Sequence, residues 1–257
     1  MVTEQRFVFD EIADEYARVR PSYPRELIDD VIAEARLGEG SRILEIGCGP
    51  GNASLLFAGR GFRMLCLEPG PHLAELARRR LDDGARVEVT TFEEWPLERH
   101  AFDLVFAAQS FHWIDPSIAL GKCALALAPG GTLAIFGNRP LVDGDTPLHK
   151  EISEAYAQHA PDIVHAPVAY NSGENFRRLI DESGLFEPAQ SHEYSWQRDY
   201  SADECVGLLR TQSDHRMLPA DRREALLAAI HAAVERHGGM RHMPYVAALG
   251  WARVRDE

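Results

Sequence analysis

The sequence contains very little lysine, with only Lys122 and Lys150 among its 257 residues. Nearly all of its positive charge is therefore arginine, whose guanidinium keeps its proton near neutral pH and cannot serve as a base. Positive charge is also in deficit, since 27 Lys and Arg stand against 40 Asp and Glu, a net charge of −13. Because such an acidic surface repels phosphate backbones, the composition disfavours a nucleic-acid partner.

The chain also lacks the features of secreted and membrane proteins. Its four cysteines lie far apart and form no CxxC pair, which excludes a disulfide scaffold and predicts small buried core residues. No stretch approaches the roughly 20 apolar residues that span a bilayer. The start of the chain carries no apolar run of the kind found in a signal peptide. We therefore expect a reduced, cytoplasmic, soluble protein with no membrane partner.

In the middle of the sequence, short apolar runs alternate with helical segments. The expected strands are residues 42–46, 62–67, 86–90, 102–107 and 132–136. The expected helices are residues 52–60, 71–81 and 117–127. Strands that are buried on both faces and joined by helices predict a parallel, doubly wound sheet with right-handed connections.

The flanking regions are less regular. Two helices are expected before residue 40, interrupted by the extended segment Pro21-Ser-Tyr-Pro24. After Asn138 the pattern predicts helices at 143–159, 173–182 and 221–236, the last with Asp221 as its N-cap, and strands at 192–200 and 245–254.

These elements predict one α/β domain over residues 1–257, with a doubly wound, mostly parallel, seven-stranded sheet. Its parts are a helical N-terminal lid (1–40), a ligand-binding core (41–138), and cap helices with the last two strands (139–257).

The chemistry is concentrated where the first strand turns into a helix, in Ile43-Leu-Glu-Ile-Gly-Cys-Gly-Pro-Gly-Asn52. Gly47, Gly49 and Gly51 lack the Cβ atoms that would keep a ligand away from the backbone. They lie at the carboxyl edge of the sheet, where doubly wound folds bind ligands. Taken alone, a glycine-rich turn is equally explained as a tight loop.

Two acidic residues narrow the choice of ligand. Glu45 precedes the glycines and would repel a dinucleotide pyrophosphate, while Glu68 ends the second strand, where a carboxylate can accept both hydroxyls of a ribose. This pair suits a ligand with a ribose and a cationic end. S-adenosylmethionine is such a ligand, since it carries an ammonium and a sulfonium and no phosphate.

At this point the sequence resembles the class I S-adenosylmethionine-dependent methyltransferases. Residues 43–52 are similar to their first motif, an acidic residue, any residue and then Gly-x-Gly-x-Gly, and Leu67-Glu-Pro-Gly70 resembles their acidic second motif. Phe102-Asp-Leu-Val-Phe106 and Leu127-Ala-Pro-Gly-Gly-Thr-Leu133 resemble the fourth strand and the turn into the fifth. The resemblance covers about residues 40–137, with the segments in the family's order.

Two further segments resemble the methyltransferase type 11 subgroup that includes trans-aconitate methyltransferase-like proteins. They are Phe9 to Pro24 and Gln109-Ser-Phe-His-Trp113. The Asn/Asp-Pro-Pro-Tyr signature of enzymes that methylate amino groups of nucleic acids is absent, and Ala107-Ala-Gln-Ser110 stands in its place. The resemblance therefore implies a small-molecule methyl acceptor and no nucleic-acid substrate.

The resemblance also implies roles for individual residues towards S-adenosylmethionine. The backbone of the glycine turn would line the methionyl and ribose portions, with Glu45 near the ammonium. Glu68 would hold the ribose hydroxyls and Pro69 would pack on the adenine. The remaining residues implied in cofactor binding, from the turn, the adenine edge and the methyl end, are Gly47, Cys48, Gly49, Gly51, the Phe92 backbone, Thr91 or Glu93, and Gln109.

Several residues keep two interpretations. Tyr16 and Arg20 lie one helical turn apart and either form an ordinary lid face or close over the cofactor, with Arg20 meeting its carboxylate. His112 could be a catalytic base, but we favour a role in the pocket wall. His231, His237 and His242 lack metal-ligand spacing, so no metal site is expected.

We expect the protein to methylate an oxygen, nitrogen or carboxylate of a small molecule by in-line displacement, as a monomer or homodimer. Arg139, Arg177, Arg210 and Arg241 are possible anchors for an anionic acceptor. Two alternatives stay open. One is a protein that binds S-adenosylmethionine without turnover, and the other is a nicotinamide-dependent oxidoreductase, which expects Gly-x-Gly-x-x-Gly, whereas position 52 is Asn.

Overall fold

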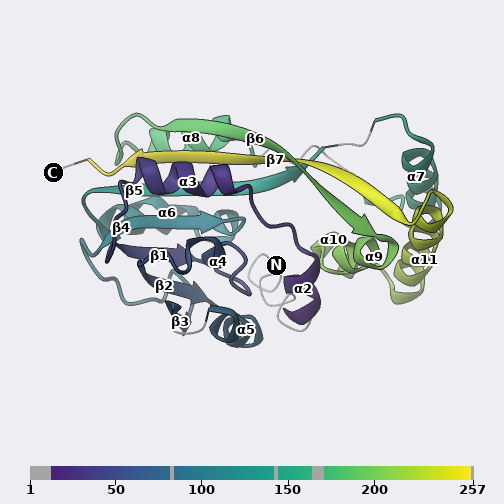
Figure 1. Cartoon of the computed structure of the whole chain (residues 1–257), viewed down its shortest axis with the longest axis horizontal. Helices are drawn as coiled ribbons and strands as arrows, with labels where there is room; N and C mark the ends of the chain where they lie inside the picture. The colour runs from purple at the N-terminus through teal and green to yellow at the C-terminus, as the bar shows by residue number, and fades with distance from the viewer. Residues whose placement is uncertain (1–12, 82–83, 142–143, 164–170, 256–257) are drawn as a thin grey trace.

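The computed structural model describes residues 13–81, 84–141, 144–163 and 171–255 (Figure 1). Its centre is one seven-stranded sheet with the strand order β3-β2-β1-β4-β5-β7-β6. The strands are β1 (Arg42–Ile46), β2 (Arg63–Glu68), β3 (Ala85–Val89), β4 (Phe102–Ala108), β5 (Leu127–Pro140), β6 (Gln190–Ser201) and β7 (Met240–Arg253). Strands β1 to β5 are parallel, and β7 runs antiparallel to both β5 and β6. The predicted mostly parallel, doubly wound sheet is confirmed.

Helices cover both faces of this sheet. On one face α3 (Arg25–Glu34), α4 (Ser54–Phe57) and α5 (Pro71–Leu81) bury apolar side chains against β1, β2 and β4. On the other face α6 (Pro116–Ala126) and α8 (Gly173–Ser183) do the same. The strand residues alternate between the two clusters because successive side chains of a strand point to opposite faces. All four cysteines are buried and free of disulfides, as expected.

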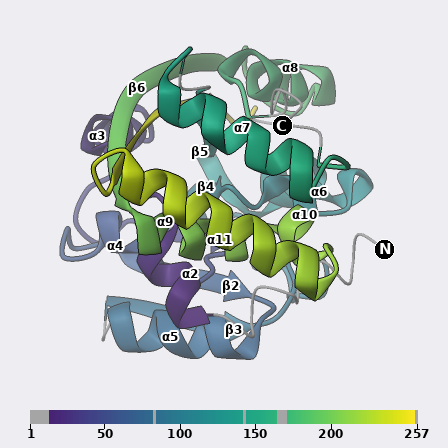
Figure 2. The same ribbon diagram turned by 90° about the vertical axis from the view of Figure 1, so that its right-hand side faces the viewer.

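The cap is a separate helical layer at the end of the long strands. It consists of α7 (Pro147–His159), α9 (Ala202–Arg210), α10 (Ser213–Arg216) and α11 (Ala220–Arg236). Helices α7 and α11 lie side by side in Figure 2 and contact each other directly. Their apolar faces form a third buried cluster together with Tyr200 and Tyr245 from the strands. The N-terminal helix α2 (Ala13–Val19) packs against α9 and so links the lid to the cap.

Strand β6 exceeds the predicted 192–200 by three residues, and β7 begins five residues before the predicted start at 245. Strands β6 and β7 pair continuously from Gln190 with Trp251 to Ser201 with Met240, and Figure 1 shows the pair reaching beyond the sheet to the cap. The extension is a two-stranded ribbon, in which hydrogen bonding continues after the apolar pattern has ended. The ribbon places the cap over the carboxyl edge of the parallel strands.

Two helix predictions need correction, and helix α9 lies where no helix was predicted. Helix α11 begins at Ala220 after Pro219, so Asp221 lies inside its first turn and is not the N-cap. Helix α4 spans only Ser54–Phe57 of the expected 52–60. Helix α9 was not predicted, because Gly207 interrupts its helical pattern. That glycine is required by close packing, since a Cβ there would lie 2.9 Å from Cγ1 of Val19 in α2.

The segment Pro21–Pro24 separates α2 from α3 as predicted, whereas Phe9 lies outside the described residues. None of the described helices is both long and apolar enough to cross a membrane.

Candidate functional site

A cavity of about 510 Å³ lies between the carboxyl ends of β1, β2 and β4 and the lid and cap. Nearly all residues predicted to form a site line this cavity. They are Tyr16, Arg20, Glu45, Gly47, Cys48, Gly49, Glu68, Pro69, Thr91, Phe92, Glu93, Gln109 and His112.

Gly51 is not among the residues that line the cavity. It has φ +83°, and a Cβ there would contact Leu81 and Ala77 of α5 at 3.4 to 3.7 Å. This glycine therefore lets the turn pack closely against α5, and it lies behind the cavity wall.

The glycine turn is held by both neighbouring strands. The backbone N–H groups of Gly47 and Cys48 donate to the Leu67 carbonyl at 2.8 and 3.0 Å. Gly47 has φ +68°, and a Cβ there would lie 2.7 Å from the Cβ of Ser110. The Ser110 hydroxyl in turn donates to the Ile46 carbonyl. The turn thus packs tightly against the segment that follows β4, and only glycine fits at its first position.

Glu68 is fixed at the end of β2 by two backbone donors. Its Oε2 accepts from the N–H of Gly49 and its Oε1 from the N–H of Gly70, both at 2.8 Å. Its side chain is buried, with 5% exposure, and lines the cavity. A carboxylate oxygen has two lone pairs, so an oxygen that accepts one backbone N–H keeps the capacity to accept a ligand hydroxyl.

Glu45 is a buried acid on the same side of the cavity. It is 1% exposed and accepts a hydrogen bond from the hydroxyl of Ser54. Burial raises the pKa of Glu45 to about 8, and the negative charge of Glu68 contributes in the same direction. A cationic group bound beside it would stabilise the ionised form. The site is therefore suited to a ligand with a positive charge.

A loop after β3 forms the next wall, and Lys122 of α6 holds it in place. Its Nζ donates to the carbonyls of Phe92, Glu93 and Trp95 at 2.6, 3.0 and 2.6 Å. The same Nζ lies 5.2 Å from the centre of the Phe92 ring. Sequence analysis did not find this role, although the rarity of lysine singles the residue out.

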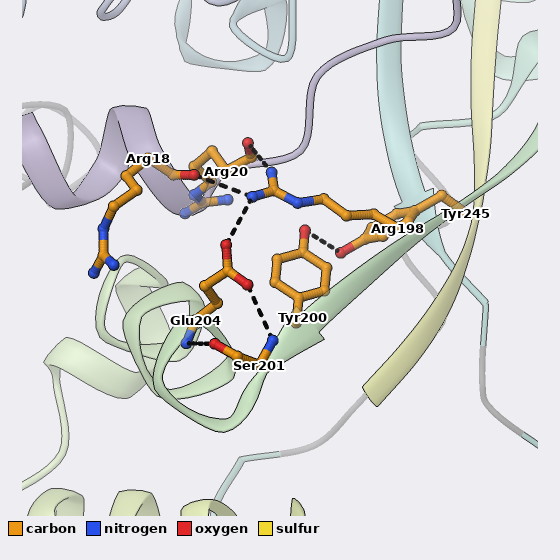
Figure 3. Close-up of polar contacts among 7 residues, drawn as sticks. All are labelled: Arg18, Arg20, Arg198, Tyr200, Ser201, Glu204 and Tyr245. Carbon is orange, nitrogen blue, oxygen red and sulfur yellow. Dashed lines mark hydrogen bonds and ion pairs between the residues drawn. The ribbon is translucent and has the colours of Figure 1, made fainter. Parts of the chain in front are cut away.

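The lid is fastened to the cap by Arg198 of β6 (Figure 3). Its Nη1 donates to the Arg20 carbonyl at 2.7 Å and its Nη2 to the Arg18 carbonyl at 3.1 Å. Glu204 of α9 lies 3.7 Å from Nη2, and the guanidinium carbon lies 4.6 Å from the centre of the Tyr200 ring. These contacts fix the C-terminal end of α2, and with it the position of Arg20 at the cavity.

The two lid residues predicted at the site also contact each other. The guanidinium of Arg20 lies 4.8 Å above the Tyr16 ring and donates to the Thr211 carbonyl of the cap. Arg20 of the lid thus contacts the cap and also lines the cavity.

His112 lies in a single 3-10 turn, Phe111–Trp113, and its ring centre is 4.7 Å from that of Trp113. His112 is an exposed residue, and partial desolvation of its imidazole lowers the pKa to about 4. At neutral pH the ring is uncharged and a weak base. This environment favours the pocket-wall interpretation over general base catalysis.

Gln109 and Asn138 connect the site to the lid. Gln109 has φ +61°, and its Oε1 accepts from the backbone N–H of Asn138 at 2.7 Å. The Asn138 amide donates to the Ser22 carbonyl at 2.9 Å and accepts from the Trp196 indole at 3.0 Å. Sequence analysis did not identify Asn138, because its partners lie far away in the chain.

The cap side of the cavity also carries residues that no motif marks. They are Leu208, Gln212, Ser213, Asp214, Met243 and Tyr245. The four arginines considered as anion anchors, Arg139, Arg177, Arg210 and Arg241, do not line it. Within the described part of the chain, no group of three or more His, Cys, Asp or Glu could hold a metal ion.

Comparisons with known proteins find methyltransferases similar to this chain. Residues 44–135 match the family model described as a methyltransferase domain. An uncharacterized methyltransferase of Mycobacterium tuberculosis is 28% identical over 238 residues, covering 90% of this chain and 89% of that protein. A trans-aconitate 2-methyltransferase of Variovorax paradoxus is 32% identical over 149 residues, covering 56% and 52% of the two chains.

Solved structures show the same fold. A putative type II methyltransferase from Anaeromyxobacter dehalogenans has a TM-score of 0.60 at 23% identity, covering 93% of this chain and 99% of that one. The phosphoethanolamine N-methyltransferase 2 of Haemonchus contortus, in complex with S-adenosyl-L-methionine, has a TM-score of 0.53 at 15% identity, covering 96% and 57%.

Proposed function

We propose that the cavity binds S-adenosylmethionine and that the protein transfers a methyl group from it to a small molecule, since residues 44–135 match the family model of a methyltransferase domain. The observation that carries the proposal is the buried carboxylate of Glu68, held by Gly49 and Gly70 beside the glycine turn. A carboxylate in this position can accept hydrogen bonds from the ribose hydroxyls, and its negative charge would repel a phosphate group.

The residues of the cavity fit this cofactor. A volume of about 510 Å³ lies within the usual range for small-molecule sites. Glu68 would hold the ribose hydroxyls, Pro69 would pack on the adenine, and the Phe92 backbone with Thr91 or Glu93 would meet the adenine edge. Glu45 would lie near the ammonium and Arg20 near the carboxylate. The backbone of Gly47, Cys48 and Gly49 would line the remaining methionyl and ribose portions of the cofactor.

When bound, S-adenosylmethionine would supply a methyl group activated by its sulfonium, which would pass in line to the acceptor while S-adenosylhomocysteine leaves as the neutral thioether. The protein's task is to align the acceptor and to exclude water, and such positioning supplies most of the acceleration in reactions of this kind. Tyr16 and Arg20 close the cavity from the lid, and Gln109 lies at the end of β4 where we place the reacting end. Because Arg198 ties the lid to the cap, both covers would move together.

Calorimetric titration tests the proposal. S-adenosylmethionine and S-adenosylhomocysteine are expected to bind with micromolar dissociation constants, and NAD, added as the control dinucleotide, is expected not to bind. Binding of NAD in preference to the other two would support the oxidoreductase alternative and contradict the proposal.

The raised pKa of Glu45 predicts that cofactor binding releases a proton. The free protein holds a proton on Glu45 below about pH 8, whereas a bound ammonium favours the ionised carboxylate. Below that pH, the affinity for S-adenosylmethionine should therefore rise with pH, with up to about one proton released per ligand.

Titrations in two buffers of different ionisation enthalpy measure this proton release. Glu45→Gln should abolish it, and Glu75→Gln, on the exposed face of α5, should leave it unchanged. Equal heats in both buffers for the unmodified protein would contradict this prediction.

Lys122→Met is expected to weaken binding of S-adenosylmethionine about tenfold, since the carbonyls of Phe92, Glu93 and Trp95 lose their shared donor. Methionine keeps the unbranched apolar stem but cannot donate. Adenosine should lose affinity by a similar factor, because the loop faces the adenine side. Lys150→Met removes the other lysine, which forms an exposed ion pair with Asp145, and is the matched control. Equal affinities of the two variants would argue against the adenine placement.

A further inference from the structure

A second cavity, of about 250 Å³, adjoins the one that we assign to the cofactor. The two cavities share three lining residues, Gln109, Ser110 and His112, which directly follow β4. The second cavity is also lined by residues of β5 and α8. The segment after β4 therefore forms a wall that is common to both cavities.

The wall of the second cavity is mainly apolar. Phe111 and Phe176 belong to the buried cluster on this face of the sheet, and Leu179 is partly exposed at 37%. Within the described part of the chain, the lining residues that carry a charge at neutral pH are Arg178 and Glu182. These two form an exposed ion pair with each other at 3.9 Å. Such a wall favours burial of an uncharged, apolar group.

Two amide side chains hold the backbone of Asn138 where the two cavities adjoin. Oε1 of Gln109 accepts from its N–H at 2.7 Å, and the Asn171 amide, which is buried, donates to its carbonyl at 3.1 Å. Gly137 gives them room, since a Cβ there would lie 2.9 Å from Oε1 of Gln109 and 3.0 Å from Oδ1 of Asn171. These contacts fix the orientation of the Gln109 amide.

The backbone of Gln109 also has an unusual conformation. Its φ of +61° lies in the left-handed region, which few residues other than glycine adopt and which is frequent at functional sites. Because its Oε1 accepts from Asn138, the amide offers Nε2, which only donates, to a molecule bound at the junction of the cavities. The group that matches this donor is a hydrogen-bond-accepting oxygen.

We propose that the second cavity binds the methyl acceptor, and that this acceptor is an uncharged molecule with an apolar body and a hydrogen-bond-accepting oxygen. The apolar body lies between α8 and β5, and Gln109 donates to the oxygen beside the reacting end of the cofactor. The proposal rests on the proposed function, because it takes the first cavity to be filled by the cofactor. The competing location for the acceptor is the cap side of the first cavity.

Methyl resonances of isotopically labelled protein show where a probe binds. S-adenosylhomocysteine is titrated first, and its failure to bind would count against the proposed function itself. The probe is 2-naphthol, an uncharged aromatic molecule with one oxygen, added to the saturated protein or, after such a failure, to the free protein. We expect saturable shifts at Ile135 and Leu179, in the second cavity, and none at Leu208 and Met243, on the cap side of the first. No saturable binding, or shifts at Leu208 or Met243 as large as those at Ile135 and Leu179, would overturn the proposal.

The charged analogue 2-naphthoate tests the preference for an uncharged acceptor. It is expected to bind at least about fivefold more weakly than 2-naphthol, because its carboxylate would lose water in an apolar cavity. Binding of 2-naphthoate as tight as that of 2-naphthol would contradict the proposed class of acceptor.

Leu179→Trp places a larger side chain in the wall of the second cavity, at a position exposed enough to accept it. It is expected to weaken binding of 2-naphthol at least tenfold and to leave the affinity for S-adenosylhomocysteine within about twofold. Leu185→Trp is the same change at an exposed position directly after α8, outside the lining of either cavity, and should bind both ligands like the unmodified protein. Unchanged binding of 2-naphthol in a folded Leu179→Trp variant would refute the location.

Gln109→Leu keeps a side chain of similar size but removes the donor. It is expected to weaken binding of 2-naphthol about fivefold, the effect of one neutral hydrogen bond, and to leave binding of naphthalene, which has no oxygen, within about twofold. Equal losses for the two probes would show that Gln109 only shapes the cavity, and would contradict the hydrogen bond to the acceptor.

Discussion

Replacing Glu68 by alanine is expected to weaken binding of S-adenosylmethionine by about 30-fold to 1000-fold. The substitution removes the acceptor for the proposed ribose hydroxyls and also leaves the N–H groups of Gly49 and Gly70 without their carboxylate. Hydrogen bonds to a charged, buried group contribute about 2–4 kcal/mol when they are lost together. Calorimetric titration of the variant measures the change.

Two further variants show whether the carboxylate itself is responsible. Glu68→Gln retains one acceptor oxygen but turns an amide N–H₂ group towards Gly49 or Gly70, so an intermediate loss is expected. Glu174→Ala, at an exposed position in the first turn of α8, should bind like the unmodified protein. Unchanged affinity in a folded Glu68→Ala variant would contradict the assignment of the ribose site.

Replacing Arg198 by methionine is expected to loosen the lid. Methionine keeps an apolar stem beside Tyr200, but the carbonyls of Arg18 and Arg20 lose their donors. Charge-assisted hydrogen bonds contribute about 1.5–3 kcal/mol each when intact, so amide exchange in α2 should accelerate at least tenfold. Affinity for S-adenosylmethionine should fall with it, because Tyr16 and Arg20 line the cavity.

Hydrogen exchange and titration together separate this effect from general destabilisation. Arg60→Met breaks an exposed ion pair with Asp29 of α3, which does not involve α2, and is the matched control. In the control, exchange in α2 and cofactor affinity should both stay unchanged. Rapid exchange throughout the sheet of Arg198→Met, or no change in α2, would show that the contact does not hold the lid.

The part of the site at the carboxyl edge of the sheet could be predicted from sequence, because each of its residues lies at the end of a strand or directly after one. Glu45 and Glu68 belong to neighbouring parallel strands, so chain order alone places them at the same edge of the sheet. The glycine turn follows directly from β1, and its backbone contacts are with the adjacent β2. Only the position of Gly51 differs, because its closest contacts come from α5, which pattern analysis cannot align with the turn.

The lid and cap could not be predicted in the same way, because their contacts join distant residues. Arg198 reaches Arg20 across 178 positions, and Tyr156 reaches His215 across 59. No periodicity marks Asp214 as a residue of the cavity. Helix α9 was not predicted because Gly207 interrupts its helical pattern. The reason for that glycine is its close contact with α2, which the sequence does not reveal.

A crystal structure of the protein with S-adenosylhomocysteine is the most direct test of the account. We expect the ribose hydroxyls within hydrogen-bond distance of the Glu68 carboxylate, the adenine beside Pro69 and Phe92, and the ammonium beside Glu45. A ligand bound elsewhere, or bound in the cavity with its ribose away from Glu68, would contradict the central claim that this cavity is built for S-adenosylmethionine.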